Sequence, residues 1–534
     1  MEAGERRRLR REAAEYYRGQ RVPERMEDVL NALFPLPPAD LYGELANYFS
    51  KFSKAPVICK LVGRKVLDGV GQPTLEVEIY CTVKNYEKRI CSTVMATHSQ
   101  IPENALPETI EADAKERNDS VHTAVQWVNE ALNTMLRDLD PTDQCQADKM
   151  LGWFRQEVII LQRKKVSAEV NPIPPAEPAE PVLRGSLAIG GTSLAIAKAG
   201  ATISRVPLYL HTALLKHNQE SPKEMTLPLP MVTVLNCEKK LPTKLKLVKE
   251  VMLIPPVELS LQQGIERVLD IQKEITRLFE SPAKRPPPLK RISHLGCLTI
   301  GYDNLEQLLL QLQTACNNIG LELGIDMYLA INFAAHELMD YGKGKYEILT
   351  GTFKTPDEMV AMYVEMIDNF PFIIALIDPL RKEDRDQWSS ICCALGSKCY
   401  LIAEDAATQI SKLTTDQNIN IAMCSGVVLK YTNQTKVSDL IELTGVLHGQ
   451  RRVTILGSPD RESSDESLVD LAVGLGARFL KLGGLSRGER VAKYNRLLAI
   501  EEELAANGAL RTSFFLTLFS ACHEYGHKDW REND

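Results

Sequence analysis

The chain lacks the features that mark secreted, membrane and disulfide-linked proteins. It starts with MEAGERRRLRREAAEYY, which has no apolar core for a signal peptide, and no later apolar run approaches the roughly 18 to 20 residues that span a bilayer. Its 12 cysteines have no CxxC spacing, and Cys392 and Cys393 lack a matching pair. We therefore expect a soluble cytoplasmic protein without membrane contact, whose cysteines are reduced and mostly buried.

The chain also lacks a strong charge of either sign. It has 63 basic and 70 acidic residues, a net charge of −7, and its one basic patch, ERRRLRRE, is confined to the N-terminal region. This balance gives no indication of nucleic-acid binding. With 534 residues, 44% of them hydrophobic and 25% charged, the chain has an ordinary globular composition and is too long for one hydrophobic core, so we expect two or more domains.

One short motif near the C-terminus resembles a zinc site. The stretch HEYGH, His523 to His527, matches the HExxH pattern in which two histidines one helical turn apart bind zinc. Gly526 weakens a helix there, and no domain follows that would supply a third ligand. We interpret the motif as a chance match in a tail.

Two short amphipathic helices are predicted near the N-terminus. Apolar residues recur at helical spacing from Val22 to Leu33 and again from Leu41 to Phe52, and Pro35, Pro37 and Asp40 lie between the two stripes. Such short helices cannot bury both stripes alone. Either they pack on the rest of the chain, or residues 15–53 pair with a second copy. The pattern resembles the dimerisation-docking module of protein kinase A regulatory subunits and many flagellar proteins, which presents a groove to an anchoring helix.

The pattern changes to strands and then to alternating strands and helices. Alternation from Val57 to Val83 around a Gly-Gln-Pro turn, followed by helical stretches, predicts an α+β domain. After about Leu227, apolar runs alternate with helices, one of which opens with a capping box at Thr355 and Glu358. Six runs end at regular steps along the chain, at Asn332, Ile377, Glu404, Lys430, Ser458 and Lys481. These βα units predict a closed β/α barrel with its active site at the carboxyl ends of the strands.

Three stretches resemble the enolase family. KLGGLSRGERVAKYNRLLAIEEEL (481–504) is similar to its C-terminal signature, GGTSLAIAKAGATISRVPLYLH (190–211) to the segment before its barrel, and RKVLDGVGQPTLEVEIY (64–80) to its first hairpin. The resemblance implies an α/β fold with a small α+β domain before a modified eightfold barrel, and a homodimer or a heterodimer with other enolase subunits. The added N-terminal helices and proline-rich inserts resemble a divergent branch of the family from the sperm flagellum.

The expected domains follow from these patterns. Residues 1–55 form the docking-like helical segment, 56–225 the α+β domain with a proline-rich insert at 171–181, 226–505 the barrel with an insert at 281–291, and 506–534 a tail.

The resemblance also implies residue roles. Enolases convert 2-phosphoglycerate to phosphoenolpyruvate with Mg²⁺ and a base, and Lys430 matches the position of that base. Lys481 matches the substrate-binding lysine, and Glu250 matches a carboxylate that contacts the substrate.

Other positions depart from the family pattern. Of three metal-binding carboxylates, the first is Asn332 and the second is Ile377, while the third corresponds to Glu404 or Asp405. Leu295 stands at the position of an acid that assists loss of hydroxide. The phosphate-binding loop aligns with GSPDRE, which places Ser458, Pro459 and Asp460 at its key positions, and the mobile loop falls at MATHS, which has no glycine.

Two functions remain after these substitutions. Loss of metal ligands and of the acid favours a catalytically impaired scaffold that supports flagellar structure, glycolysis and sperm motility, with Mg²⁺ binding weak or absent. The alternative is an active phosphopyruvate hydratase. In either case the remaining cationic residues predict a pocket for a phosphorylated or carboxylated small molecule.

Overall fold

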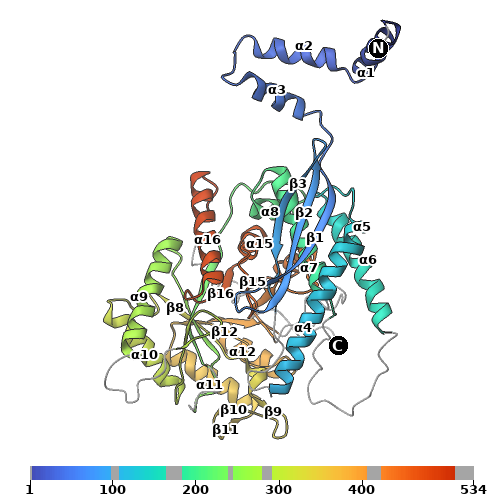
Figure 1. Cartoon of the computed structure of the whole chain (residues 1–534). Helices are drawn as coiled ribbons and strands as arrows, with labels where there is room; N and C mark the ends of the chain where they lie inside the picture. Colours follow the sequence, from blue (N-terminus) through green and yellow to red (C-terminus); the bar gives the residue numbers. More distant parts are fainter. Residues whose placement is uncertain are drawn as a thin grey trace, which may run out of the picture. The chain divides into compact units, whose positions relative to one another are not determined.

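The computed structural model describes residues 3–97, 107–163, 183–237, 244–279, 291–405 and 423–511. The insert at 171–181, residues 281–290 and the HEYGH motif lie outside this part of the chain. The chain divides into two compact units, Met1–Val57 with Cys81–Lys88 and Ile58–Tyr80 with Arg89–Asp534. Figure 1 shows the helices and strands of both units.

Three helices make up most of the first unit: α1 (Ala3–Gly19), α2 (Val22–Leu33) and α3 (Leu41–Ser50). Both helices predicted from the apolar stripes are present, whereas α1 was not predicted. The Asp40 carboxylate caps α3 by accepting a hydrogen bond from the Gly43 backbone N–H at 2.9 Å. The Arg25 guanidinium of α2 lies 3.9 Å from the centre of the Phe52 ring, just past α3.

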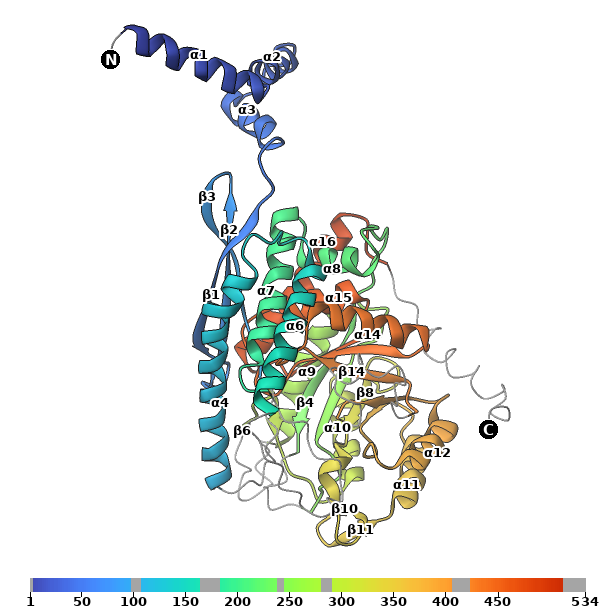
Figure 2. The same cartoon turned by 90° about the vertical axis from the view of Figure 1, so that its right-hand side faces the viewer.

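The α+β region begins with a three-stranded sheet and continues with helices. Its strands, in the order β1-β2-β3, are β1 (Val57–Leu67), β2 (Pro73–Val83) and β3 (Tyr86–Val94). The helical segments are α4 (Pro107–Trp127), a π-helical turn (Val128–Leu132), α5 (Asn133–Met135), α6 (Gln144–Arg163), α7 (Leu187–Ser204) and α8 (Leu208–Lys216). Figure 2 shows α4 running beside the sheet. A Cβ atom on Gly63 of β1 would lie 2.9 Å from Val128 Cβ, so only glycine permits this close approach.

Helix α7 corrects one expectation from composition. Among the described residues it is the one helix long and apolar enough to cross a membrane, with a mean hydropathy of 1.2, although no such stretch was expected. However, 78% of that stretch is buried inside the protein, as in a core helix of a globular domain. The described cysteines are free thiols.

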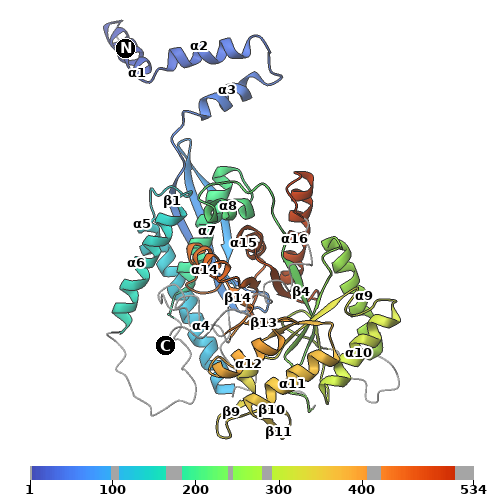
Figure 3. The ribbon, with the colours of Figure 1, turned by 180° about the vertical axis from the view of Figure 1, so that it is seen from behind.

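Eight strands close the barrel that the sequence predicts, and Figure 3 shows it from behind. In order around the barrel they are β4 (Leu229–Asn236), β5 (Glu250–Ile254), β8 (Tyr328–Asn332), β12 (Ile373–Ile377), β13 (Tyr400–Ala403), β14 (Gly426–Lys430), β15 (Val453–Gly457) and β16 (Phe479–Gly483), with β16 pairing back to β4. Strand β5 runs antiparallel to both of its neighbours, and the other pairs are parallel. The expected modified eightfold barrel is confirmed.

The helices of the barrel region are α9 (Leu261–Phe279), α10 (Leu305–Asn318), α11 (Pro356–Asn369), α12 (Arg385–Leu395), α14 (Val437–Gly449), α15 (Ser467–Leu475) and α16 (Gly488–Ala506). The predicted capping box opens α11, where Thr355 and Glu358 exchange hydrogen bonds. Short additional elements are β6 (Arg291–Ile292), β7 (Leu298–Thr299), the 3₁₀ helix η2 (Ala335–Leu338), β9 (Met339–Asp340), β10 (Lys345–Leu349) and β11 (Thr352–Lys354).

Candidate functional site

Most of the predicted site residues meet at one end of the barrel, which we call the barrel mouth. Asn332, Ile377 and Lys430 are the last residues of their strands, and Glu404 directly follows β13. Glu250 is the first residue of β5 and pairs with Asn332 across the ladder. Because β5 is antiparallel, its beginning lies at the same end of the barrel as the carboxyl ends of the parallel strands.

Glu404 lies between the two lysines of the mouth. Its carboxylate is 2.7 Å from Lys430 Nζ and 3.0 Å from Lys481 Nζ. The three side chains are 5%, 16% and 9% exposed, respectively. Charged groups so far from water need partners of opposite charge, and Glu404 supplies one to both lysines at once.

Glu250 forms the second link of this network. One of its oxygens accepts hydrogen bonds from Lys481 Nζ at 3.0 Å and from Asn332 Nδ2 at 2.9 Å. The other oxygen accepts one from the Thr233 hydroxyl at 3.2 Å. Asn332 is thus a donor to a carboxylate, a role that an aspartate at the same position would fill only if it were protonated.

These contacts decide the protonation states at the mouth. Burial alone would lower the pKa of Lys430, but Glu404 and Asp405 outweigh it and raise that pKa well above its usual value. Burial likewise opposes the charge on Lys481, whose pKa is raised by Glu250 and Glu404. Burial alone would raise the pKa of Glu404, yet the two lysines hold it well below its usual value. Both lysines are therefore protonated, and Glu404 is ionised, at neutral pH.

The residue after Ile377, Asp378, carries a carboxylate. Ile377 is fully buried and belongs to the apolar cluster inside the barrel. Asp378 adopts a left-handed conformation with φ of 45°, and its carboxylate accepts hydrogen bonds from the backbone N–H groups of Glu404 at 2.8 Å and Asp405 at 2.7 Å. Burial, together with Asp405 and Glu404, raises the pKa of Asp378 to about 6. Sequence reasoning missed this residue, although an aspartate before Pro379 at a strand end was the available signal.

Asp405 is more exposed than its neighbour Glu404, which lies between the two lysines. Its side chain is 37% exposed, and its Oδ2 is 3.9 Å from His336 Nε2. One ligand atom from each of His336, Asp378 and Asp405 lies within 4.8 Å of the other two. Glu337, next to His336, pairs with Lys249 at 2.7 Å.

The magnesium position expected from the resemblance does not fit Mg²⁺. The Asn332 carboxamide is engaged at both ends, because its oxygen accepts a hydrogen bond from the Ala334 N–H at 3.0 Å. Ile377 offers only hydrocarbon, and Glu404 is held by two lysines. Mg²⁺ needs about six oxygen ligands in a near-octahedral arrangement, which these three residues do not supply.

The loop after β15 is organised by a buried arginine. Arg490 Nη1 donates a hydrogen bond to Ser458 Oγ at 2.7 Å, and Nη2 donates to the Asp460 carbonyl at 3.1 Å and to the Pro459 carbonyl at 3.4 Å. Leu295, predicted from the resemblance to stand at the position of an acid, is 6% exposed and has no ionisable group. Of these predicted positions, only Asp460 carries an acidic side chain, and none is a histidine.

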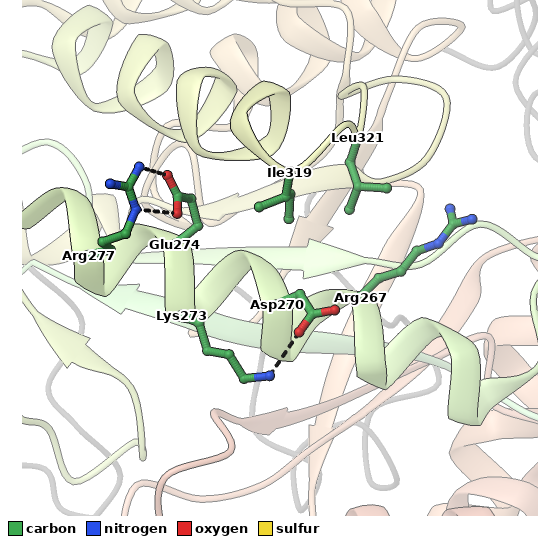
Figure 4. A pocket seen from close by; sticks show the side chains of 7 residues that line it. All are labelled: Arg267, Asp270, Lys273, Glu274, Arg277, Ile319 and Leu321. Carbon is green, nitrogen blue, oxygen red and sulfur yellow. Dashed lines mark hydrogen bonds and ion pairs between the residues drawn. The ribbon is translucent and has the colours of Figure 1, made fainter.

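A separate cavity of about 370 Å³ lies against α9, and none of the mouth residues lines it (Figure 4). Its basic side chains are matched by carboxylates, as Arg277 contacts Glu274 at 2.6 Å and Lys273 contacts Asp270 at 2.9 Å. The third basic side chain, Arg267, contacts Asp326 at 3.0 Å, so each basic side chain of the cavity has a carboxylate partner.

Comparisons with known proteins agree with this architecture. The family model described as "Enolase, C-terminal TIM barrel domain" matches residues 224–516. The chain is 49% identical to Enolase 4 of Homo sapiens across 94% of its own length and 89% of that protein, and 48% identical to Enolase 4 of Mus musculus across 94% and 90%. It is 37% identical to Enolase 4 of Danio rerio across 93% and 91%. Together with the barrel and its antiparallel β5, these matches show that the chain belongs to the enolase family.

Proposed function

We propose that this chain is a catalytically impaired member of the enolase family that acts as a scaffold in the sperm flagellum. The observation that carries the proposal is the Glu404 carboxylate, which contacts Lys430 at 2.7 Å and Lys481 at 3.0 Å. By resemblance, Lys430 stands at the position of the base. A lysine must be neutral to accept a proton, and the raised pKa of Lys430 keeps it protonated.

The groups that should assist the base support the same conclusion. Asn332 and Ile377 replace two metal-binding carboxylates, and Leu295 replaces the acid. Metal polarisation supplies several kcal/mol of transition-state stabilisation, and a positioned acid or base supplies roughly 10²- to 10⁴-fold in rate. Their combined loss predicts turnover lower by many orders of magnitude, and tight Mg²⁺ binding at these positions is not expected.

The flagellar role rests on resemblance and on the N-terminal helices. The likeness to Enolase 4 and the added helices support a location in the sperm flagellum and a part in local glycolysis and motility. The proposed complex contains a homodimer, or a heterodimer with other enolase subunits. A phosphorylated or carboxylated ligand would have to displace Glu404 from the two lysines, so we expect such ligands to bind weakly.

The enzymatic part of the proposal is tested by assaying the purified full chain with 2-phosphoglycerate and excess Mg²⁺. We expect turnover roughly 10³-fold or more below that of an active enolase measured in parallel. The convergence of Lys430, Lys481 and Glu250 at the mouth favours the alternative, an active phosphopyruvate hydratase. Ordinary turnover by the parent chain, abolished by Lys430→Ala, would establish that alternative.

The docking part of the proposal concerns residues 15–53. Several apolar side chains of this segment are exposed, among them Met26 at 41%, Leu30 at 48% and Phe52 at 46%. We propose that a second copy covers this face and that the paired helices form a groove for a flagellar anchoring helix.

Hydrogen–deuterium exchange of the full chain tests the pairing locally. Amides of residues 22–50 should exchange more slowly at high than at low protein concentration, because pairing protects them. Leu45→Asp with Phe49→Asp should remove that dependence, and Asn47→Asp, at an exposed position of α3, should keep it. Exchange independent of concentration in the parent chain would contradict self-pairing.

A further inference from the structure

We propose that His336, Asp378 and Asp405 bind one divalent transition-metal ion, at a site distinct from the expected magnesium position. The site would take ions that accept imidazole nitrogen, such as Mn²⁺, in preference to Mg²⁺. This inference goes beyond the proposed function, since it holds whether or not the barrel turns over substrate.

The three side chains come from neighbouring strands of the barrel. His336 lies in η2 after β8, Asp378 is the first residue after β12, and Asp405 is the second after β13. One ligand atom from each lies within 4.8 Å of the others. Ligand atoms around a metal ion at about 2.0 to 2.2 Å are typically about 3 to 4 Å apart, so small side-chain rotations would complete the arrangement.

Asp378 is already oriented as a ligand. Its two oxygens accept the backbone N–H groups of Glu404 at 2.8 Å and of Asp405 at 2.7 Å, and the side chain is 1% exposed. Hydrogen bonds to a ligating carboxylate fix its orientation in metal sites. Here one of the two donors is the backbone N–H of Asp405, which is also a proposed ligand.

The His336 imidazole has unused hydrogen-bonding capacity. Its Nδ1 is buried and has no hydrogen-bond partner among the described residues. Its Nε2 is 3.9 Å from both Asp405 Oδ2 and Glu337 Oε1, beyond hydrogen-bond distance. An unsatisfied buried nitrogen is costly, and coordination of a metal ion would satisfy one of the two ring nitrogens.

The charge of the mouth also favours a cation. Glu404 and Glu250 neutralise Lys430 and Lys481, and Glu337 neutralises Lys249. Asp378 and Asp405 add two further carboxylates within 4.8 Å of one ring nitrogen of His336. Two negative charges this close repel each other, and a divalent ion between them would reverse the sign of that interaction.

The chemistry of the donors selects the class of ion. Mg²⁺ prefers oxygen ligands and keeps several waters, whereas imidazole together with carboxylates suits first-row transition metals. Mn²⁺ is the most useful probe because it accepts carboxylates and imidazole and has little affinity for the free thiols of this chain.

The test is a titration of the metal-free full chain with Mn²⁺, followed by electron paramagnetic resonance of the free ion. We expect one bound Mn²⁺ per chain that roughly a 100-fold excess of Mg²⁺ fails to displace, given the imidazole ligand. Asp405→Asn and His336→Gln should each weaken binding at least about tenfold. Both side chains are more than one third exposed, at 37% and 39%, so the variants should fold like the parent.

Two matched variants serve as controls. Asp303→Asn removes an exposed carboxylate elsewhere on the barrel, and His523→Gln with His527→Gln removes the HExxH match in the tail. Both should bind Mn²⁺ like the parent chain. Absence of bound Mn²⁺, equal binding by Asp405→Asn and His336→Gln, or displacement by equimolar Mg²⁺ would each overturn the proposal.

Discussion

The two sides of the barrel mouth handle charge in opposite ways. On the side of β13, β14 and β16, Glu404, Lys430 and Lys481 form ion pairs with distances of 2.7 and 3.0 Å. On the side of β8 and β12, Asn332 is neutral, and Ile377 belongs to the apolar cluster of the barrel. Both sides are buried, and both lie at the barrel mouth.

The difference shows what a buried charge requires. Lys481 keeps its charge because Glu250 and Glu404 lie 3.0 Å away, and Glu404 keeps its charge because two lysines contact it. The neutral side chains of Asn332 and Ile377 need no partner of opposite charge, so burying them avoids that penalty. The Asp378 carboxylate, one residue beyond Ile377, is satisfied by backbone N–H groups.

Of the changes considered, removal of the Glu404 carboxylate, which Lys430 and Lys481 share, should destabilise the fold most. Glu404→Gln leaves two buried lysines with too little negative charge, so we expect a loss of about 3 to 5 kcal/mol in the free energy of unfolding. Denaturant unfolding in the presence of a chelator measures it.

Asp405→Asn is the matched control, because its side chain is 37% exposed and lies 4.0 Å from Lys430. It should change the free energy of unfolding by less than about 1 kcal/mol. Equal losses for the two variants would show that Glu404 does not hold the lysines.

An acid titration extends the comparison to Asp465, a paired carboxylate outside the mouth. It accepts hydrogen bonds from Lys198 at 3.1 Å and Thr93 at 2.7 Å. Burial opposes its charge, but Lys198 and the hydrogen bonds of Ser467 and Thr93 lower its pKa to about 2.

A folded pKa below the unfolded value of about 3.9 means that the stabilisation is present above pH 4 and disappears as the pH falls through about 2. Above pH 4, ionised Asp465 therefore contributes about 2 to 3 kcal/mol to the free energy of unfolding. The difference in unfolding midpoint between the parent chain and Asp465→Asn should therefore shrink from pH 6 to pH 3. A constant difference across that range would contradict the assignment.

The smallest expected effect comes from removing the hydrogen bond that the Thr233 hydroxyl donates to Glu250. Thr233→Val keeps the shape of the side chain but removes the hydroxyl that donates to Glu250 at 3.2 Å, and it should lower the free energy of unfolding by about 1.5 kcal/mol.

Thr299→Val is its control, because the buried Thr299 hydroxyl has no hydrogen-bond partner in the described part of the chain. That change should be neutral or stabilising. Equal destabilisation by both variants would mean that packing, and not the bond to Glu250, sets the effect. Thermal unfolding measures both.

The sequence determined by itself where several barrel strands end. Apolar runs stop at Asn332, Ile377 and Lys430, and all three are the last residues of barrel strands. The capping box at Thr355 was equally readable, because caps depend on residues three positions apart. Local patterns of this kind need no knowledge of distant neighbours.

Tertiary structure alone decided the direction of β5 and the roles of the carboxylates. An apolar run has the same composition whichever way it crosses the sheet, so only pairing with β4 and β8 brings Glu250 to the mouth. Glu404 and Asp405 are neighbours in sequence, yet one lies between two lysines and the other lies near His336. Those partners come from strands far apart in the chain, and the energy of a buried charge depends on them rather than on its own sequence context.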